Sequence, residues 1–473
     1  MYHERMSQPL KIELDRSAKT PLAEQIRSAI SAAIEGGVLA PGARLPSWLD
    51  LAAQLGVARG TVRLAYDRLS DSQLIVASRA AGTRVADRPR AWPEAEESRD
   101  PGSFMEMYRE LTAGPAIFQM GVPAQETLPA RLFTKVRSFA LRAESSASVG
   151  YPDPRGELEL RREIAAYLAI ARGMTCSPAQ IIVTSGFSGG LGLALRVLGL
   201  DGHKAWFEDP GFPFTRHGLE LARLELAPVP VDADGIDVDY GLRHAPDAAL
   251  AVVTPGQQAP LGPTLSLARR LQLLEWAQQQ GAWIIEDDYL SELQLSARAA
   301  PALVSLDRGQ RVIHIGSFSK TISPALRLGF VVAPATLASR FAEVAACLAP
   351  APWPSVQLAT AQFMREGHYL RHLRRLKRLY SAQRAALLEC LGALDFETKS
   401  AGLAVLVRLP DGAPDVSIFR EALAFGLGPA PLSPWYMSPA SARSGLLLGI
   451  ATSPERNLVR SCERLREVIR RHA

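Results

Sequence analysis

The sequence predicts an α/β protein in which a small helix-rich module precedes a large domain with a mostly parallel sheet. The chain has 473 residues, which is long for a single domain. Beyond residue 116, short apolar runs such as "QIIVTSG", "AWIIEDDY" and "RVIHIGSFSK" alternate with amphipathic helical patterns. This alternation is typical of parallel strands joined by helices. Before residue 87 the patterns are mainly helical and end in a short strand pair.

Composition divides the chain into three parts. Residues 10–87 are predicted to form the N-terminal domain. Residues 88–115 are rich in Pro, Glu and Arg and poor in core residues, which predicts a linker with one short helix at Phe104–Leu111. Residues 116–473 are predicted to form the large domain, whose smaller C-terminal α/β subdomain covers roughly residues 340–473.

Three predicted helices make up most of the N-terminal domain. The first covers "TPLAEQIRSAISAAIEGG", with a Thr cap, a Pro in the first turn and Gly at the end. The second follows "LPS" and stops at Gly56, and the third covers "ARGTVRLAYDRLSD". The third helix is expected to turn Arg59, Thr61 and Arg63 outward at its N-terminal end. A helix that enters the DNA major groove presents this end to bases and phosphates.

A predicted wing follows these helices. "LIVASRAAGTRVAD" indicates two strands around a small turn, with Arg79, Thr83 and Arg84 near the tip. Seven arginines lie between residues 59 and 90 and only three aspartates oppose them, as a phosphate-binding face requires. We therefore expect a winged helix-turn-helix that binds a double-stranded DNA operator. A small three-helix bundle with solvated arginines remains the alternative.

Other features of the sequence argue against several classes of protein. No apolar run reaches the length of a membrane span, and the N-terminal segment lacks the apolar stretch of a secretion signal. The four cysteines are far apart and show no metal-ligand spacing. We expect a cytoplasmic protein with reduced thiols, no membrane partner and no metal site.

A lone lysine in "VIHIGSFSKTISPALRLGFV" directly follows a predicted buried strand. The amine of Lys320 can form a Schiff base with an aldehyde. A pyridine ring bound there also needs a carboxylate at its nitrogen, a flat side chain over one face and a donor to its hydroxyl. Asp287 and Tyr289 close the strand "AWIIEDDY", and Phe212 follows another strand in "EDPGFP".

A phosphate group on that ring would need backbone N–H groups and an arginine. "TSGFSGGLGLAL" turns from a strand into a helix, so the N–H groups near Phe187 and Ser188 are expected to point at an anion. Arg327 lies seven residues after Lys320, and Ser317 is close by. Each residue alone has an ordinary alternative, such as a core aromatic, a glycine-rich turn or a surface lysine. Together, at the ends of successive strands, they predict a site for a cofactor with an aldehyde, a pyridine ring and a phosphate.

Two parts of the chain resemble known families. "GVLAPGARLPS", "LAAQLGVARGTV", "AYDRL" and "AGTRV" resemble the winged helix-turn-helix of GntR-type repressors. "GYPDPRGELELRREIAAYL", "VTSGFSGGL", "IIEDDYLSE" and "IGSFSKTISPALRLGF" resemble fold-type-I aminotransferases. The whole chain therefore resembles MocR/GabR-type transcriptional regulators. This resemblance implies a large α/β/α subdomain, a smaller C-terminal subdomain and bound pyridoxal 5'-phosphate.

The resemblance also implies a role for each site residue. Lys320 would form the internal aldimine, Asp287 would pair with the pyridine nitrogen and Tyr289 would bond the ring hydroxyl. Phe212 takes the place of the usual stacking Tyr. The phosphate would be held by Ser188, Ser317 and Arg327, and by Tyr151 from the neighbouring subunit. The last contact implies a homodimer with shared sites.

Three positions depart from the pattern of the aminotransferases or of the related regulators. Leu447 stands where these enzymes carry the Arg that binds the substrate carboxylate, and a carboxylate without a cationic partner is poorly bound in a closed site. Phe214 stands where the GABA-sensing relative has an Arg, and Ala259 replaces an Asn that touches the ring hydroxyl. Arg216 and Arg443 are candidates for a substitute cation. The departures argue against efficient transamination and against GABA as the effector.

Three functions remain open at this point. The first is a regulator whose aminotransferase-like domain senses an amine, an amino-acid-like effector or pyridoxal phosphate itself through the Lys320 aldimine. The second is an active aminotransferase with a vestigial DNA-binding domain, and the third is a DNA-binding protein whose large domain is only a dimerisation scaffold. The missing Arg favours the first or the third, and the intact Lys320 and Asp287 favour the first. We therefore predict a regulator rather than an enzyme, with a residual half-reaction left open.

Overall fold

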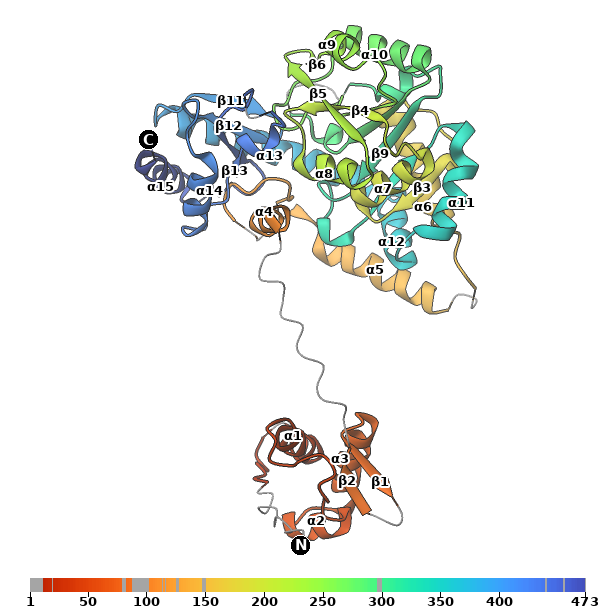
Figure 1. Ribbon diagram of the computed structural model, residues 1–473, viewed down its shortest axis with the longest axis vertical. Coiled ribbons are helices and arrows are strands. Elements are labelled where there is room, and N and C mark those ends of the chain that lie inside the picture. Colours follow the sequence, from red (N-terminus) through yellow and green to blue (C-terminus); the bar gives the residue numbers. More distant parts are fainter. Residues whose placement is uncertain are drawn as a thin grey trace. The chain divides into compact units, whose positions relative to one another are not determined.

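A computed structural model of the protein (Figure 1) describes residues 12–18, 20–78, 82–86, 102–112, 114, 116–124, 127–146, 150–295, 300–438, 440–453 and 456–472. The chain divides into two compact units, Met1–Glu106 and Met107–Ala473, which we name unit 1 and unit 2. The boundaries at residues 87, 88, 115 and 116 stay predictions.

Unit 1 is a three-helix module with a β-hairpin, as the sequence predicts. Its elements are α1 (Leu22–Glu35), α2 (Trp48–Leu55), α3 (Arg59–Asp71), β1 (Ile75–Ser78) and β2 (Gly82–Val85). The two strands pair antiparallel, with Ile75 opposite Val85. Apolar side chains at helical spacing, among them Ile26, Ile30 and Val62, are fully buried in one core. Burial of this stripe fixes which side of α3 remains exposed.

The large sheet of unit 2 has eight strands in the order β3-β10-β9-β8-β7-β4-β5-β6. Their bounds are β3 (Ile181–Thr184), β4 (Lys204–Asp209), β5 (Glu225–Asp232), β6 (Gly235–Ile236), β7 (Leu250–Val253), β8 (Trp283–Asp288), β9 (Val312–Ser317) and β10 (Gly329–Val332). Strands β5, β4, β7, β8 and β9 run parallel. Strand β10 is antiparallel to both of its neighbours. The mostly parallel sheet is thereby confirmed.

Helices cover both faces of this sheet, and inner strands such as β7 and β10 are buried along their whole length. The helices are α5 (Ala130–Ser145), α6 (Leu158–Arg172), α7 (Gly186–Leu198), α8 (Pro213–Leu221), α9 (Val238–His244), α10 (Leu267–Gln280), α11 (Ala338–Leu348) and α12 (Pro354–Arg365). Ile182 packs in a core with α7, α8 and α11, whereas its neighbours Ile181 and Val183 pack in a core with α6 and α12. Neighbouring residues of a strand thus face opposite sides.

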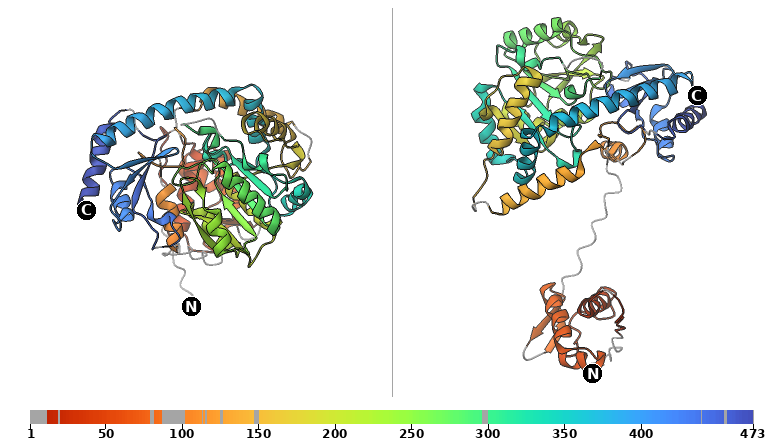
Figure 2. Two further views of the ribbon diagram at one scale, coloured as in Figure 1. Left: turned by 90° about the horizontal axis from the view of Figure 1, so that it is seen from above. Right: turned by 180° about the vertical axis from the view of Figure 1, so that it is seen from behind.

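A smaller antiparallel sheet forms the C-terminal part of unit 2, in the order β11-β12-β14-β13. Its strands are β11 (Thr398–Ala401), β12 (Ala404–Arg408), β13 (Ala430–Pro431) and β14 (Gly445–Gly449), and its helices are α13 (His368–Gly392), α14 (Asp415–Leu423) and α15 (Leu458–Arg471). Figure 2 shows the long α13 running from the large sheet to the small one. The predicted small subdomain is present.

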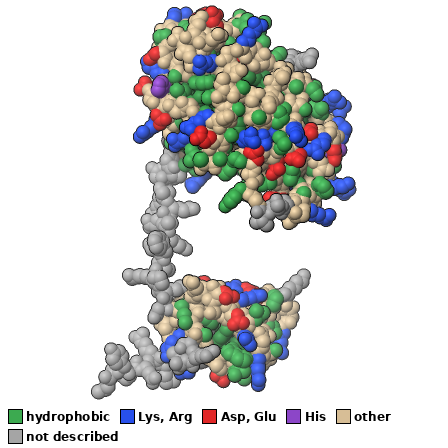
Figure 3. Space-filling view, turned by 90° about the vertical axis from the view of Figure 1, so that its right-hand side faces the viewer, with side chains coloured by type: hydrophobic (Ala, Val, Ile, Leu, Met, Phe, Trp, Pro, Cys, Tyr) green, Lys and Arg blue, Asp and Glu red, His purple; other side chains and the backbone are tan. Residues whose placement is uncertain are grey.

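The linker helix predicted at Phe104–Leu111 is present as α4 (Gly102–Thr112). None of the helices in the described ranges is long and apolar enough to cross a membrane. On the face of unit 2 seen in Figure 3, Lys and Arg side chains lie among Asp and Glu. This mixture agrees with the small net charge of +5 for the whole chain.

Candidate functional site

Lys320 lies in the turn between β9 and β10, directly after the carboxyl end of β9. Its Nζ donates a hydrogen bond to the carbonyl of Gly121. Burial lowers the pKa of Lys320 to about 8, and the Asp287 carboxylate opposes this by raising it. A larger fraction of this amine is therefore neutral at physiological pH than for an ordinary lysine, and the neutral amine is the nucleophile.

Asp287 lies near the carboxyl end of β8, opposite Ile315 of the parallel neighbour β9. It is buried, and its Oδ1 has no hydrogen-bond partner among the described residues. Burial is the main cause that raises the pKa of Asp287 well above 3.8, followed by the charges of Asp288 and Glu208, whereas Lys320 lowers it. Asp287 and Lys320 therefore lie at the ends of neighbouring parallel strands, which agrees with the effect of each on the pKa of the other.

Glu208 is a member of this cluster that the sequence reading missed. It lies in β4, is 5% exposed, and accepts a 2.6 Å hydrogen bond from the Thr254 hydroxyl. Burial raises the pKa of Glu208 to about 7. Its charge also raises the pKa values of Asp287 and Tyr289. The sequence signal was its position in "EDPGFP" at a strand end.

The predicted stacking residue Phe212 directly precedes α8, at the carboxyl end of β4. Its ring centroid lies 5.5 Å from that of Trp435 and 5.0 Å from that of Phe214. Phe212 and Tyr289 pack against one apolar cluster that includes Ala259 and Leu447. The structure therefore brings the predicted ring contacts into one apolar environment.

The predicted phosphate contacts come from three neighbouring strands. Thr184 of β3 and Ser317 of β9 lie on either side of Gly329 of β10. Helix α7 begins two residues after Thr184 and therefore starts near Ser317. The residue before α7 makes no side-chain capping bond, which leaves the N–H groups of the first turn near Phe187 and Ser188 for an anion. These elements can form a cradle for a phosphate.

A cation stands at the same edge of the sheet. Arg327 follows the short 3-10 helix η5 (Pro324–Leu326), with a φ of 47°. Its side chain is exposed and forms no hydrogen bond or ion pair with any described residue. Ser317 donates a 3.0 Å hydrogen bond to the Ser319 hydroxyl. Tyr151 is fully exposed, and its contact with a cofactor in a neighbouring subunit stays a prediction.

These residues fit pyridoxal phosphate. The lone Oδ1 of Asp287 can accept a hydrogen bond from a protonated ring nitrogen, which would remove the cost of a buried, unpartnered carboxylate. The free guanidinium of Arg327 and the start of α7 can take the phosphate. Gln258, the neighbour of Ala259, does not present a free amide to such a ring. Its Nε2 instead donates to the carbonyls of Pro210 and Ala259, and its Oε1 accepts from a backbone N–H.

The place expected to bind a substrate carboxylate is apolar. Leu447 in β14 is fully buried and pairs with Leu406 of β12. The two candidate substitute cations are engaged elsewhere. Arg216 donates to the carbonyl of Tyr436 at 3.0 Å, and Arg443 forms an exposed ion pair with Asp411 at 2.8 Å.

The predicted DNA contacts lie on the exposed side of unit 1. Arg59 and Arg63 are exposed near the start of α3, and neither has an ion-pair partner among the described residues. Thr61 is half-buried beside them, and Thr83 is half-buried in β2. The exposed Arg84 donates a 2.8 Å hydrogen bond to the Gly42 carbonyl. Arg79 lies outside the described residues.

Comparison with known proteins agrees with this division. Residues 22–85 match the bacterial regulatory proteins of the gntR family, and residues 120–423 match aminotransferase class I and II. The chain is 32% identical to the "Probable rhizopine catabolism regulatory protein MocR" of Rhizobium meliloti, with 93% of this chain and 92% of that protein covered. It is also 32% identical to the pyridoxine biosynthesis transcriptional regulator PdxR of Corynebacterium glutamicum, with 93% and 94% covered. The chain belongs to the MocR-type transcriptional regulators.

Solved structures confirm the fold of the large domain of this MocR-type regulator. An archaeal alanine:glyoxylate aminotransferase is 25% identical, with a TM-score of 0.70 over 78% of this chain and 95% of that one. LysN, an α-aminoadipate aminotransferase from Thermus thermophilus, is 25% identical, with a TM-score of 0.68 over 77% and 94%. That protein was solved with N-(5'-phosphopyridoxyl)-L-leucine. Pyridoxal 5'-phosphate, predicted from the sequence, is the cofactor of this family.

The exposed arginines of α3 lead to a prediction about salt dependence. Arg59→Ala should weaken DNA binding and make the log–log slope of affinity against salt shallower by about 0.9, because one phosphate contact is lost. Arg68→Ala is the matched control on the same helix, since Arg68 already pairs with Glu24 at 2.9 Å. Filter-binding assays at several salt concentrations give both slopes. An unchanged slope in Arg59→Ala would exclude this part of α3 as a phosphate contact.

The lone carboxylate leads to a second prediction. Asp287→Asn should weaken binding of pyridoxal phosphate about 10- to 100-fold, because a charge-assisted hydrogen bond contributes about 1.5–3 kcal/mol. In the cofactor-free protein, a raised carboxyl pKa means that Asp287 contributes less stability as pH rises above 3.8. The Asn variant should therefore lose less stability on the alkaline side.

Cofactor titrations and thermal unfolding at several pH values measure these effects, with the exposed Asp201→Asn as the control. Unchanged cofactor affinity in Asp287→Asn would contradict the pairing of this carboxylate with the ring.

Proposed function

We propose that this protein is a pyridoxal-phosphate-dependent transcriptional regulator of the bacterial cytoplasm. Unit 1 binds a double-stranded DNA operator, and unit 2 senses an amine, an amino-acid-like effector or the cofactor itself at Lys320. The observation that carries the proposal is the buried Asp287 carboxyl group, whose Oδ1 has no hydrogen-bond partner among the described residues, beside a lysine whose pKa is lowered. A scaffold without a ligand gains nothing from such a pair, because an unpaired buried polar group is costly.

Each residue of the site has a separate task in this proposal. Bound pyridoxal phosphate supplies an aldehyde that can combine with an amine. Lys320 provides the attachment point, Asp287 holds the proton of the ring nitrogen and Tyr289 donates to the ring hydroxyl. Phe212 covers one face of the ring. The phosphate is bound by Arg327, Ser317, the start of α7 at Phe187 and Ser188, and the partner subunit's Tyr151.

The surroundings of Leu447 favour sensing over turnover. An α-carboxylate placed against this apolar cluster would lose its hydration without gaining a cation. Arg216 and Arg443 already serve backbone carbonyls and Asp411. An effector that binds here is therefore an amine that places an apolar group against Leu447. Otherwise it is a molecule, such as the cofactor itself, that is held by the cofactor-binding residues. An active aminotransferase with a vestigial DNA-binding domain is the alternative, and repeated turnover of an amino donor with a keto acid would support it.

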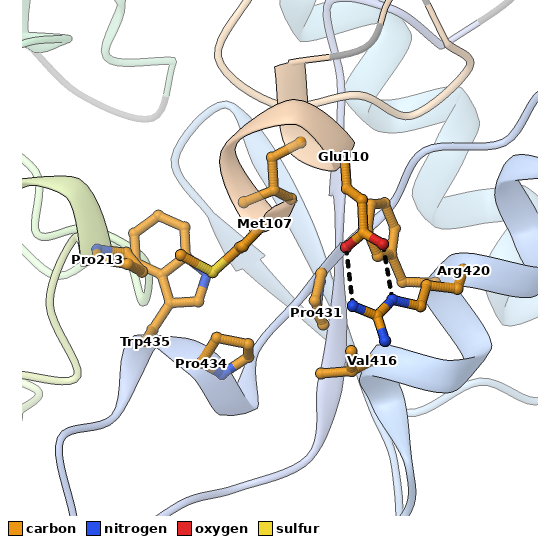
Figure 4. A pocket seen from close by; sticks show the side chains of 10 residues that line it. Met107, Glu110, Pro213, Val416, Arg420, Pro431, Pro434 and Trp435 are labelled. Atoms are coloured by element: carbon orange, nitrogen blue, oxygen red, sulfur yellow. Dashed lines mark hydrogen bonds and ion pairs between the residues drawn. The ribbon is translucent and has the colours of Figure 1, made fainter. Parts of the chain in front are cut away.

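Contacts of α4 offer a route from the site to the linker. The ring of Tyr108 in α4 lies 5.2 Å from that of Phe214, which in turn contacts Phe212. Figure 4 shows Glu110 of α4 facing Arg420 of α14, with N–O distances of 2.7 and 3.3 Å. A ligand that moves Phe212 would therefore disturb the end of the linker. A change in linker freedom shifts the population of dimers able to reach both half-sites.

Colour and DNA binding together test this function. The purified protein should be yellow, and borohydride should fix the chromophore to the peptide that contains Lys320. Lys320→Ala should lose the colour and also lose any difference in operator affinity between the cofactor-free and cofactor-loaded protein. Lys399→Ala, an exchange of an exposed lysine on β11, should keep both properties. A colourless protein that ignores added cofactor would support the scaffold, and unchanged DNA responses in Lys320→Ala would contradict the sensor.

A further inference from the structure

A second cavity lies on the opposite face of the large sheet from Asp287. It has a volume of about 210 Å³ and is bounded by α6, α13 and the 3-10 helix η3 (Ser291–Leu293). Asp288, the next residue of β8, turns to this side and pairs with Arg172 of α6 at 2.9 Å. Because neighbouring strand residues face opposite sides, this cavity is distinct from the Lys320 site.

Arg172 lines the cavity with an unused donor. Its side chain is 1% exposed, its Nε donates to Asp288, and its Nη1 donates to the carbonyl of Ala300. Its Nη2 is buried and has no hydrogen-bond partner among the described residues. A guanidinium carries five N–H donors, and a buried donor without an acceptor costs about 1–3 kcal/mol. Asp288 Oδ1 is likewise buried without a partner among the described residues, so one N–H of Nη2 can turn to Asp288 and the other is available to an anionic ligand.

Two further cations stand at the same cavity. Arg374 and Lys377 are three residues apart on α13, so they share one side of that helix. Neither forms an ion pair with any described residue. Glu292 is the acid among the residues that line the cavity. Its pKa is raised to about 7, mainly by burial and secondly by the charge of Asp288. Part of the Glu292 population is therefore uncharged near neutral pH.

Basic and acidic side chains face one another beneath the cavity. A ring nitrogen of His314 lies 3.1 Å from Glu286, and the other lies 3.8 Å from Asp288. Burial lowers the pKa of His314, but the two carboxyl groups raise it by more, so the pKa is raised overall. Arg172 and His314 thus face the carboxyl groups of Asp288 and Glu286. Arg374 and Lys377 add positive charge that forms no ion pair with any described residue, and this favours an anion as the ligand.

Apolar side chains complete the wall. Leu373 of α13 and the ring of Tyr167 of α6 line the cavity, and burial raises the pKa of the Tyr167 phenol, which keeps it a neutral donor. A cavity of about 210 Å³ has room for a small organic molecule, since one water needs only about 10–15 Å³ of such space. We propose that this cavity binds a small organic anion, namely a short-chain carboxylate. Its carboxylate bonds Arg172 Nη2 and the cations of α13, and its chain packs on Leu373 and Tyr167.

Titration of the cofactor-loaded full chain with butyrate tests this site. Butyrate should bind saturably in ligand-observed NMR and raise the thermal unfolding temperature, because a ligand of the folded state stabilises it. Arg374→Gln combined with Lys377→Gln should weaken butyrate binding at least tenfold. Arg378→Gln, an exposed arginine on the same helix outside the cavity wall, is the matched control and should bind butyrate as the unaltered chain does.

Two further binding measurements, made at constant ionic strength, test the site with another variant and another anion. Arg172→Lys keeps the charge opposite Asp288 but removes the guanidinium donors, and it should lose butyrate binding while remaining folded. Inorganic phosphate should bind more weakly than butyrate, because it has no chain for the apolar wall. The proposal is overturned if butyrate does not saturate, if the double variant binds it unchanged, or if phosphate binds equally well.

Discussion

The structure of the site depends on a lysine and a carboxylate held at the ends of two adjacent parallel strands. Asp287 lies near the end of β8 and Lys320 directly follows β9, and each changes the pKa of the other. Neither charge is well solvated, and the carboxylate oxygen Oδ1 has no hydrogen-bond partner among the described residues. A fold keeps such a costly pair where a ligand completes it, because perturbed ionisable groups concentrate at functional sites.

The order of the sheet determines what else can reach this pair. Strands β4 and β7 bring Phe212 and the loop of Gln258 to the same edge, and β3 and β10 bring the start of α7 and Arg327. The small sheet adds the apolar side chain of Leu447, where a working aminotransferase would need a cation. We propose that the same scaffold keeps contacts for a pyridine ring, while the surroundings of Leu447 are apolar where an amino-acid carboxylate would need a cation.

The sequence predicted most of this arrangement because strand ends are marked by short polar motifs. "IIEDDY" and "GSFSK" gave the positions of Asp287 and Lys320 relative to their strands, and the parallel order then forced them together. The helical periodicity of α1 and α3 likewise predicted the exposed side of unit 1. These are local patterns with one dominant structural solution.

Features that depend on contacts between distant segments could not be predicted in this way. Glu208 reads as an ordinary strand-end acid until Thr254 and Asp287 are placed beside it. The pairing of Arg172 with Asp288 joins residues 116 positions apart, and no motif marks it. The engagement of Gln258 with its own loop also becomes visible only in the folded backbone.

The most direct test of the account is the pKa of the Lys320 amine, followed by NMR of its side chain in the cofactor-free protein. The account predicts a value of about 8, and a lower value still in Asp287→Asn, because the carboxylate raises it. A value near 10.5 in the unaltered chain, with no response to the loss of Asp287, would mean that the two groups do not share a buried site and would contradict the account.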